Sequence, residues 1–332
     1  MDNHIKQNAS LSLTHTFNRT SCQTIEYNPF SVLYLFMFPV ALLLNSVAAW
    51  VSIHLKSTTT FIVYLKNLIG ADLILTLALP AIAASDLPNA SHRIFVLSCR
   101  FFSVIFYGAL YTSITFLGLI SLDRFTKIVT PQNKFGQSVI LTSVVSVAVW
   151  LIVFVFPALS TMILSSKDGN ETVIETCMDT KVPAGLVFHT YLTISLNVYF
   201  WVVSVIVAIC YICITNKVIQ SFRNSGSNNS KGKQKIKLRV FLVLVVFFVS
   251  FGPYHIIRIP YTFEQVNSDY GCSYIWFIKE FGLWLATNNI CLDPLLYVFL
   301  CREFNEKLLS LLSNVPCLYN ILRRIFPDTA GE

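Results

Sequence analysis

The sequence predicts an all-α membrane protein built as a bundle of seven transmembrane helices. Of its 332 residues, 55% are hydrophobic and only 12% are charged, whereas a soluble globular domain carries about 25% charged residues. A helix needs about 20 mostly apolar residues to cross the hydrocarbon core of a bilayer, and seven stretches of roughly this length or more are present. Five of them contain no Asp, Glu, Lys or Arg: residues 27–55, 101–122, 135–166, 182–216 and 240–257.

The other two stretches carry charged residues inside an apolar run. Residues 67–85 are interrupted only by Asp72, and the stretch 275–300 contains three charged residues, namely Lys279, Glu280 and Asp293. Because backbone polar groups in lipid must be hydrogen-bonded within their own segment, we expect helices and not open strands. An odd number of spans places the two termini on opposite sides of the membrane.

The distribution of charged residues predicts the orientation. With the N-terminus outside, 16 of the 24 Lys and Arg residues fall on the inner side, and 10 of the 17 acidic residues fall outside. Because inner loops are enriched in Lys and Arg, we expect the N-terminus outside at the plasma membrane. Four glycosylation tripeptides agree with this orientation, since all of them lie on the side assigned to the outside: Asn8, Asn18, Asn89 and Asn170.

Three regions are expected along the chain. Residues 1–27 form a polar, glycosylated arm, residues 28–300 the helical bundle, and residues 301–332 an amphipathic helix with a tail. Residues 217–239, inside the bundle region, are rich in Ser, Asn, Gly and Lys, which predicts a flexible solvated linker. After residue 300, CREFNEKLLSLL places four apolar side chains on one face, as in a helix that lies along a membrane surface: Phe304, Leu308, Leu311 and Leu312.

Polar residues inside a membrane are costly and point to function. Asp72 lies in the middle of a span, with Asn45 and Ser113 also deep. Asn289 and Asp293 are four residues apart, so they share one face of the seventh helix. A lone carboxylate at this depth takes up a proton or finds a cation. Asp72 therefore belongs to an ion or relay site, or it is a protonated, hydrogen-bonded core acid.

Six motifs, each on its own span, give the chain a resemblance to the rhodopsin-like G-protein-coupled receptors. The resemblance covers roughly residues 25–312. The motifs are Asn45, LIGADL with Asp72 and Leu73, Cys99 with Asp123–Arg124–Phe125, Trp150, FGP from Phe251 to Pro253, and DPLLY from Asp293 to Tyr297. Two positions depart from the common pattern, since Phe125 replaces a tyrosine and Asp293 an asparagine.

This resemblance implies a receptor that activates a G protein and performs no covalent chemistry. Asp123 would hold Arg124 at rest, and an outward swing of the sixth helix would free the arginine to meet the G protein. Tyr211 and Tyr297 would belong to the same switch. The alternative interpretation is an arginine that merely extends to the membrane edge.

The resemblance also implies further partners and covalent links. Four outer cysteines have three pairings that spacing cannot distinguish, and the family implies Cys99–Cys177 and Cys22–Cys272. Arrestin is an expected partner. No cofactor is expected, although a sodium ion could bind near Asp72, in a polar core that comprises Asp72, Ser113, Asn289 and Asp293. We expect no other metal and no nucleic acid partner.

Four stretches resemble the purinergic nucleotide receptors, and most of all the subgroup that responds to ADP or UDP-sugars through inhibitory G proteins. They are SVIFYGALY (103–111), FLGLISLDRF (116–125), PYHIIRIPYT (253–262) and ICLDPLLYVFLCREF (290–304). This favours ADP as the ligand, with UDP-sugars and lysophospholipids as alternatives. Thr193, Leu196 and Phe95 depart from residues found in ADP receptors, so the receptor class is better supported than the nucleotide.

The residues themselves favour an anion site near the outer helix ends. Arg258, Lys279 and Lys181 suit a diphosphate, because charge-assisted contacts to phosphate are strong, and tyrosine faces suit a stacked base. Lys279 paired with an outer acid such as Glu280, and Lys181 as a solvated loop charge, are the alternatives. The full expected set of ligand-binding residues is Tyr107, Tyr111, Lys181, His189, His255, Arg258, Tyr261 and Lys279.

A transporter or proton channel is the alternative from a different class of protein. Asp72 and Asp293 could form a relay, but the two halves of the chain do not mirror each other as many transporter halves do. Ligand-dependent GTP loading without transmembrane flux would separate the two classes. No HExxH, GxSxG or P-loop pattern occurs, so an enzyme is not expected.

Overall fold

The computed structural model describes residues 28–55, 59–87, 90–132, 138–165, 176–224, 230–266 and 274–312. Within these residues all regular secondary structure is helical. The elements are α1 (Pro29–Ile53), α2 (Thr60–Ser85), α3 (His92–Leu97), η1 (Ser98–Phe102), α4 (Ser103–Val129), α5 (Val139–Val149), η3 (Trp150–Val155), α6 (Phe156–Ile163), α7 (Pro183–Asn224), α8 (Ser230–Val266), α9 (Tyr274–Thr287), α10 (Asn289–Leu300) and α11 (Arg302–Leu312).

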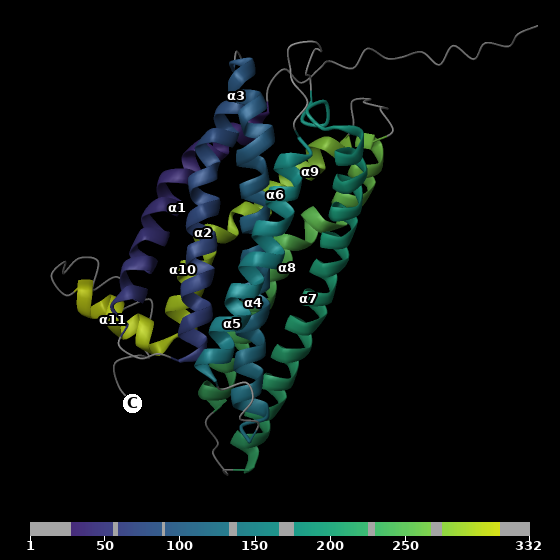
Figure 1. Cartoon of the computed structure of the whole chain (residues 1–332). Helices are drawn as coiled ribbons and strands as arrows, with labels where there is room; N and C mark the ends of the chain where they lie inside the picture. The colour runs from purple at the N-terminus through teal and green to yellow at the C-terminus, as the bar shows by residue number, and fades with distance from the viewer. Residues whose placement is uncertain are drawn as a thin grey trace, which may run out of the picture.

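The long helices lie side by side in one bundle (Figure 1). Six described helices are long and apolar enough to cross a bilayer, and the segment Tyr274–Val298, joined to Arg302–Leu311 at a bend of 93°, makes up to seven. Two of these spans contain a π-helical turn, η1 before α4 and η3 between α5 and α6. α2 packs against α1 and α4, α4 against α7, and α8 against α7 and α9. The predicted fold class is confirmed.

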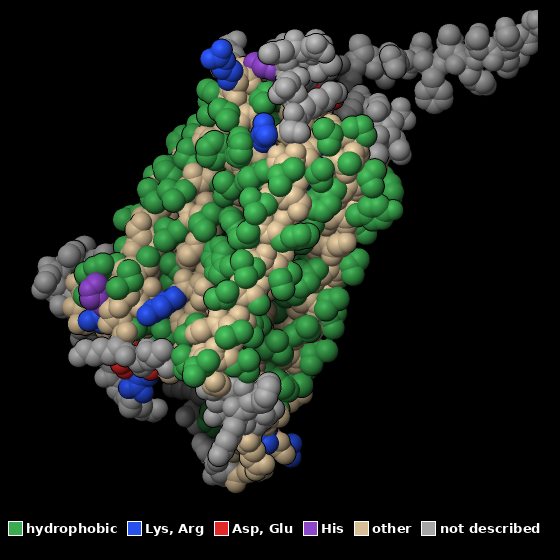
Figure 2. All heavy atoms as spheres, viewed as in Figure 1, with side chains coloured by type: hydrophobic (Ala, Val, Ile, Leu, Met, Phe, Trp, Pro, Cys, Tyr) green, Lys and Arg blue, Asp and Glu red, His purple; other side chains and the backbone are tan. Residues whose placement is uncertain are grey.

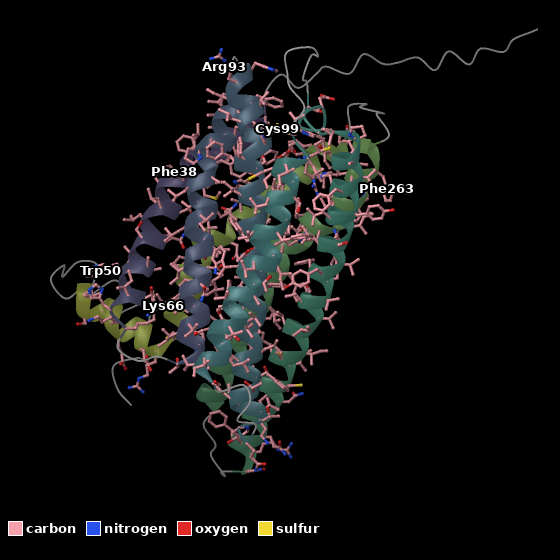
Figure 3. All side chains as sticks on the ribbon, viewed as in Figure 1. Phe38, Trp50, Lys66, Arg93, Cys99 and Phe263 are labelled. Atoms are coloured by element: carbon pink, nitrogen blue, oxygen red, sulfur yellow. A yellow bond between two sulfur atoms is a disulfide. The ribbon has the colours of Figure 1, made fainter. Side chains whose placement is uncertain are left out.

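The outer surface of the bundle is apolar, as a bilayer requires. Phe36 on α1 is 71% exposed and Ile140 on α5 is 79% exposed. Hydrophobic side chains cover the long face in Figure 2, and most Lys and Arg side chains lie toward its two ends. Figure 3 shows the same division, with Cys99 at one end and Trp50 and Lys66 toward the other. We call the end with Cys99 the disulfide end. The end with Trp50 and Lys66, where α11 also lies, is called the α11 end.

The seventh span differs from the single helix that the sequence predicts, because it breaks at Asn288 between α9 and α10. The side chain of Asn288 donates to the carbonyl oxygen of Trp284 at 2.8 Å, and such side-chain bonds compete with the helical backbone. Pro294 lacks the N–H that would bond to Ile290 four residues earlier. The carbonyl oxygen of Ile290 instead accepts a hydrogen bond from Asn45 Nδ2 at 2.8 Å, which joins α1 to α10.

The predicted linker at 217–239 is wrong in its extent. α7 continues to Asn224 and α8 begins at Ser230, so both helices project beyond the apolar runs. The residues there include several Lys, Gln and Arg residues, which are good helix formers. A charged and polar composition suggests a loop, but it is equally typical of solvated helix ends.

α11 has the predicted amphipathic character. Phe304 and Leu308 are buried in a hydrophobic cluster with Val51, Phe61 and Tyr297. On the exposed side, Arg302 Nε donates to Glu306 Oε1 at 2.6 Å.

Candidate ligand cavity and polar core

A cavity of about 360 Å³ opens among the helices at the disulfide end. α1, α2, η1, α4, α6, α7, α8 and α9 all contribute to its wall, together with the loop before α7. Seven of the eight predicted ligand-binding residues line it: Tyr107, Tyr111, Lys181, His189, Arg258, Tyr261 and Lys279.

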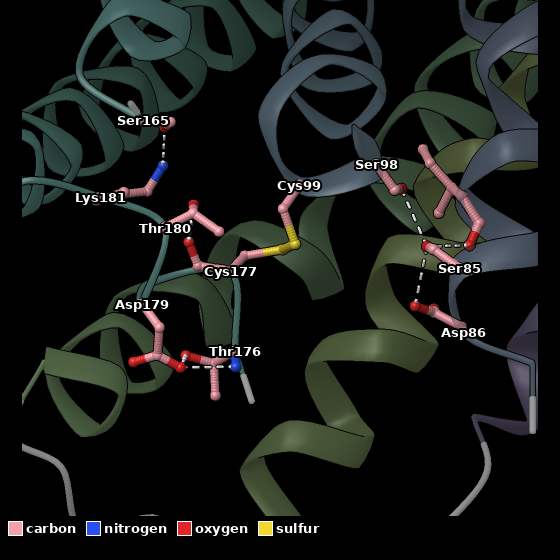
Figure 4. The surroundings of a disulfide bond; sticks show 11 residues. Ser85, Asp86, Ser98, Cys99, Ser165, Thr176, Cys177, Asp179, Thr180 and Lys181 are labelled. Atoms are coloured by element: carbon pink, nitrogen blue, oxygen red, sulfur yellow. Dashed lines mark hydrogen bonds between the residues drawn. A yellow bond between two sulfur atoms is a disulfide. The ribbon is translucent and has the colours of Figure 1, made fainter. Parts of the chain in front are cut away.

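The loop that borders the cavity is fixed by a disulfide between Cys99 on η1 and Cys177, with a Cα–Cα distance of 5.2 Å (Figure 4). Asp179 Oδ2 accepts from the backbone N–H of Thr176 at 2.7 Å, and the Lys181 N–H bonds to the carbonyl oxygen of Met178 at 3.0 Å. These bonds form a compact turn that directs Lys181 toward the bundle. The predicted Cys99–Cys177 pair is confirmed.

Lys181 is not the solvated loop charge considered as its alternative. It is only 7% exposed, and its ammonium group donates to Ser165 Oγ at 3.2 Å. Burial lowers the pKa of this ammonium group to about 8. A buried ammonium group on a cavity wall favours an anion in that cavity, because an opposite charge offsets the cost of removing the cation from water.

Arg258 on α8 lies among three tyrosine rings. Its guanidinium carbon is 5.5 Å from the ring centroid of Tyr107, 5.8 Å from that of Tyr254 and 5.9 Å from that of Tyr261. The residue is 7% exposed. Because aromatic faces attract a cation, these rings position the guanidinium group while its N–H donors stay suited to a phosphate.

Lys279 on α9 has the ring of Tyr261 as a neighbour, as this arginine does. Its ammonium group is 4.7 Å from the ring centroid of Tyr261 and forms a buried ion pair with Glu280, which is the pairing considered above as its alternative. A Cβ atom at Gly282 would lie 2.8 Å from the backbone nitrogen of Tyr254, so α8 and α9 are in close contact at this level. That close approach brings the two basic side chains to one wall of the cavity.

Asp86, at the end of α2, adds a second carboxylate to this wall. It accepts hydrogen bonds from Asn28 Nδ2 at 3.0 Å and from Ser31 Oγ at 3.4 Å. Burial, and then the charge of Glu280, raise the pKa of Asp86 to about 6, although Asn28 and Lys279 oppose the shift. Lys279 therefore has an acidic neighbour, Asp86, whose charge changes with pH.

His255 is placed differently from the prediction. Its ring stacks on Phe200 with centroids 3.6 Å apart, and its Nδ1 lies 2.8 Å from the carbonyl oxygen of Phe251. It is 1% exposed and belongs to the core, whereas Tyr254 faces the cavity. Residues 254 and 255 are both within helical reach of Arg258, so spacing alone could not show which of them lies on the cavity wall.

The four residues of the predicted polar core lie together in the centre of the bundle. Asp72 accepts from Ser113 Oγ at 3.0 Å and from the Tyr297 hydroxyl at 3.0 Å. Asn289 Nδ2 donates to Asp293 Oδ2 at 2.6 Å. Within the described residues, the Oδ1 atoms of Asn289 and Asp293 are buried and receive no hydrogen-bond donor, and the Asp293 carboxyl group adjoins that of Asp72. Oxygen acceptors of this kind fit a proton or a small hard cation.

Comparison with known proteins identifies the family. Residues 44–297 match the family model described as "7 transmembrane receptor (rhodopsin family)". The chain belongs to this family. It is 41% identical to human purinoceptor 13 over 84% of this chain and 80% of that protein. It is also 38% identical to bovine purinoceptor 14 over 83% of each chain, and 37% identical to mouse G-protein coupled receptor 87 over 89% of this chain and 86% of that protein.

This rhodopsin-family chain is therefore a purinoceptor-type member of the nucleotide receptors. It is a multi-pass protein of the plasma membrane and not an enzyme. The family implies a nucleotide ligand and coupling to a G protein. The transporter alternative does not agree with this membership.

At the α11 end of this receptor, the Asp–Arg pair is held by neighbouring side chains. Asp123 accepts from Thr60 Oγ1 and, at 2.9 Å, from Lys127 Nζ. The guanidinium carbon of Arg124 lies 3.9 Å from the ring centroid of Phe61. Tyr211 and Tyr297, the other predicted switch residues, are both buried and line a second, smaller cavity nearby. The switch role of the four residues stays a prediction.

Several wall residues were not among the predicted site residues, namely Tyr34, Ser85, Asp86, Ser98, Tyr254 and Glu280. Asp86 had a detectable signal, because it is an acid at the edge of an apolar run. Tyr254 is four residues before Arg258, so helical spacing allowed it to share the face of Arg258 but did not single it out. The predicted glycosylation sites and the Cys22–Cys272 pair lie outside the described residues.

Replacing Cys99 with serine should reduce the amount of receptor at the cell surface to a small fraction of the wild-type level. The disulfide holds the loop that carries Lys181, and loss of such a bond costs about 2–5 kcal/mol of stability. Surface labelling of intact cells would measure this. The control is Cys213→Ser, since Cys213 is a free cysteine on α7. Equal surface levels of both variants would contradict the expected role of the disulfide.

Proposed function

We propose that this receptor responds to an extracellular nucleotide, with ADP as the favoured ligand, and signals through an inhibitory-type G protein. The observation that carries the proposal is the pair of buried basic residues, Arg258 and Lys279, on one wall of the cavity. In this proposal the N-terminus and the disulfide end face the outside. The α11 end faces the cytoplasm, where the G protein and arrestin bind.

The charges and shapes of the cavity support a diphosphate. Arg258 offers a planar fork of donors that matches phosphate oxygens, and Lys279 adds a compact charge. Lys181, on the loop before α7, supplies a third cation to the cavity wall, with its ammonium group bonded to Ser165 just after α6. These three groups receive the phosphates, while the ring of Tyr107 supports the base.

A sugar nucleotide is the second candidate, and a specific observation favours it. The carboxylates of Asp86 and Glu280 lie on the same wall as Lys279. Carboxylates accept hydrogen bonds from hydroxyl groups, so a hexose joined to the terminal phosphate would find partners there. ADP offers fewer hydroxyl groups to this pair.

The polar core supports a further part of the proposal. Asp72, Ser113, Asn289 and Asp293 would hold a sodium ion through their oxygen atoms. The ion would supply a positive charge that stabilises two neighbouring carboxylates in their ionised form. The Oδ1 atoms of Asn289 and Asp293, which receive no donor among the described residues, are the observation that fits this role.

A ligand panel on membranes from cells that express the full chain tests the proposed function. ADP, a UDP-sugar and a lysophospholipid would each be added, and GTP loading would be measured on an inhibitory-type and on a stimulatory-type G protein. We expect ADP to load the inhibitory type at the lowest concentration. A response to the lysophospholipid alone would overturn the nucleotide assignment, and a response of the stimulatory type alone would overturn the coupling.

The affinity for a nucleotide should rise as the pH falls from 7.5 to 5.5, relative to the Asp86→Asn variant. Because the pKa of Asp86 is about 6, its carboxylate is charged above that pH and repels an anion. Below that pH it is neutral. We expect the wild-type protein to gain about three- to fivefold in affinity relative to the variant, since charges across a wet cavity interact by roughly 1 kcal/mol.

Competition binding on intact cells at a series of pH values would measure this effect. The phosphate of the ligand also titrates near pH 6, but it does so equally for both proteins, so the ratio of their affinities isolates the contribution of Asp86. The groups that face Asp86 are Asn28, Ser31, Ser85, Lys279 and Glu280. A ratio that stays constant across the pH range would contradict the prediction.

A further inference from the structure

We propose that the ring of Phe61, on α2, holds Arg124 in its resting position and thereby sets the level of signalling without ligand. Phe61 is then a positioning residue of the switch. This inference rests on the proposed function, because it requires Arg124 to activate the G protein.

The geometry of the contact supports the proposal. The guanidinium carbon of Arg124 lies 3.9 Å from the centre of the Phe61 ring, whereas the three rings around Arg258 are 5.5 to 5.9 Å from that arginine. At 3.9 Å the two planar groups are in direct contact. The face of an aromatic ring carries partial negative charge and attracts a cation.

Phe61 is itself firmly held. It is only 5% exposed and belongs to a hydrophobic cluster with Leu65, Ile120 and Tyr297. Phe61 also borders the smaller cavity, but that cavity of about 30 Å³ is too small to take up the ring. The ring therefore cannot follow Arg124 if the arginine moves toward a partner. Movement of Arg124 therefore breaks the contact.

The first turn of α2 contacts both members of the Asp–Arg pair. Thr60 donates to one carboxylate oxygen of Asp123, and Lys127 donates to the other. The next residue of α2, Phe61, contacts Arg124. At the start of α2, Thr60 thus holds Asp123 through its hydroxyl group. The adjacent Phe61 holds Arg124 through the face of its ring.

The consequence for signalling follows from a two-state equilibrium. A contact that is present only at rest favours the resting state, and its loss raises the active fraction. We expect an increase in ligand-independent GTP loading of about two- to tenfold when the attraction is removed. Agonist-stimulated maximal loading should change little, because the contact is already broken in the active state.

The test must separate electrostatic attraction from packing, because Phe61→Ala would remove both. Phenylalanine with one, two or three ring fluorines nearly preserves the size of the ring and progressively weakens the negative charge on its face. These residues would be incorporated at position 61 of the full-length receptor. Membranes would be treated with a nucleotide-degrading enzyme before basal GTP loading is measured, with each value divided by the surface amount.

The matched control is the same series at Phe116. This residue is fully buried in the same cluster, but its described ring contacts are with Tyr64 and Trp150. We expect basal loading to rise stepwise with fluorine number at position 61 and to stay constant at position 116. Phe61→Leu, which keeps an apolar side chain without an aromatic face, should match or exceed the fully fluorinated ring.

Two results would overturn the proposal. Constant basal loading across the series at 61 would assign the ring to packing alone, and decreasing basal loading would assign the contact to the active state. Failure of the proposed function would be seen separately, in Arg124→Ala. If that variant still loads GTP normally, the proposed switch role of Arg124 is wrong. If it is inactive and the fluorine series at position 61 gives constant basal loading, the switch role stands and only the role of Phe61 is wrong.

Discussion

Replacing Arg124 with alanine is expected to abolish activation of the G protein while ligand affinity stays within about twofold of the wild-type value. The reason is distance along one helix. Arg124 and Tyr107 both lie on α4, 17 residues apart, which corresponds to about 25 Å along the helix axis. The ligand cavity at the disulfide end therefore keeps all of its wall residues in the variant.

Two measurements on the same membranes would check this expectation. Binding of a labelled nucleotide reports on the cavity, and nucleotide-stimulated GTP loading reports on the switch. Lys127→Gln is the matched control, because it removes a basic residue one turn away whose ammonium group bonds to Asp123. The control should still load GTP. Normal loading by Arg124→Ala would exclude it as the residue that activates the G protein.

The helices could be predicted from the sequence because lipid imposes a simple rule on composition. The charge-free stretch 27–55 corresponds closely to α1, Pro29–Ile53. The rule failed where a charged side chain is tolerated at a helix surface. The stretch 67–85 starts seven residues after the true beginning of α2 at Thr60, because Lys66, an exposed residue, interrupted the apolar run.

The cavity could be predicted only in part, because helical spacing leaves a choice of face. Arg258, Lys279 and Lys181 all line it, and each was recognisable as a cation at the end of an apolar segment. The sequence could not show that Tyr254, and not His255, lines the cavity. This depends on the stacking of His255 against Phe200 from another helix. Contacts between helices that are distant in sequence decide such details.

The contacts at the α11 end show the same limit. The Asp123–Arg124 pair was visible as a motif, but its partners Thr60 and Phe61 begin a helix more than 60 residues earlier. A sequence motif identifies groups that carry the chemistry. It does not identify the side chains that hold those groups, because these come from whichever helix packs beside them.

Replacing Arg258 with alanine should reduce nucleotide potency about ten- to a hundredfold. Loss of one hydrogen-bonded charged contact costs about 1.5–3 kcal/mol, and each 1.4 kcal/mol corresponds to a factor of ten. The variant should reach the cell surface, because the described contacts of Arg258 are mainly to tyrosine rings and its removal leaves no buried carboxylate without a partner. Dose–response curves of GTP loading would measure the change.

Arg258→Lys should recover little of this loss, although it conserves the charge. A lysine cannot present a two-pronged donor to phosphate, and its compact ammonium group cannot stack among the rings of Tyr107, Tyr254 and Tyr261 as a planar guanidinium group does. Potency should also fall as salt rises, but less than for exposed charges, because the site is enclosed by helices. Recovery of wild-type potency by Arg258→Lys would show that charge alone suffices.

The decisive comparison applies Arg258→Ala to ADP and to a lysophospholipid side by side. Arg100→Ala is the matched control, since Arg100 also lies at the disulfide end, 5.5 Å from the ring centroid of Phe101, in the same π-helical turn as Cys99. If the phosphates of a nucleotide bind at Arg258, the ADP response falls in Arg258→Ala and is retained in Arg100→Ala. An unchanged ADP response in Arg258→Ala, with normal surface amounts, would remove Arg258 from the phosphate site. The lipid response is measured in the same variants. If Arg258→Ala loses the lipid response and keeps the ADP response, Arg258 binds the phosphate of a lipid and not that of a nucleotide.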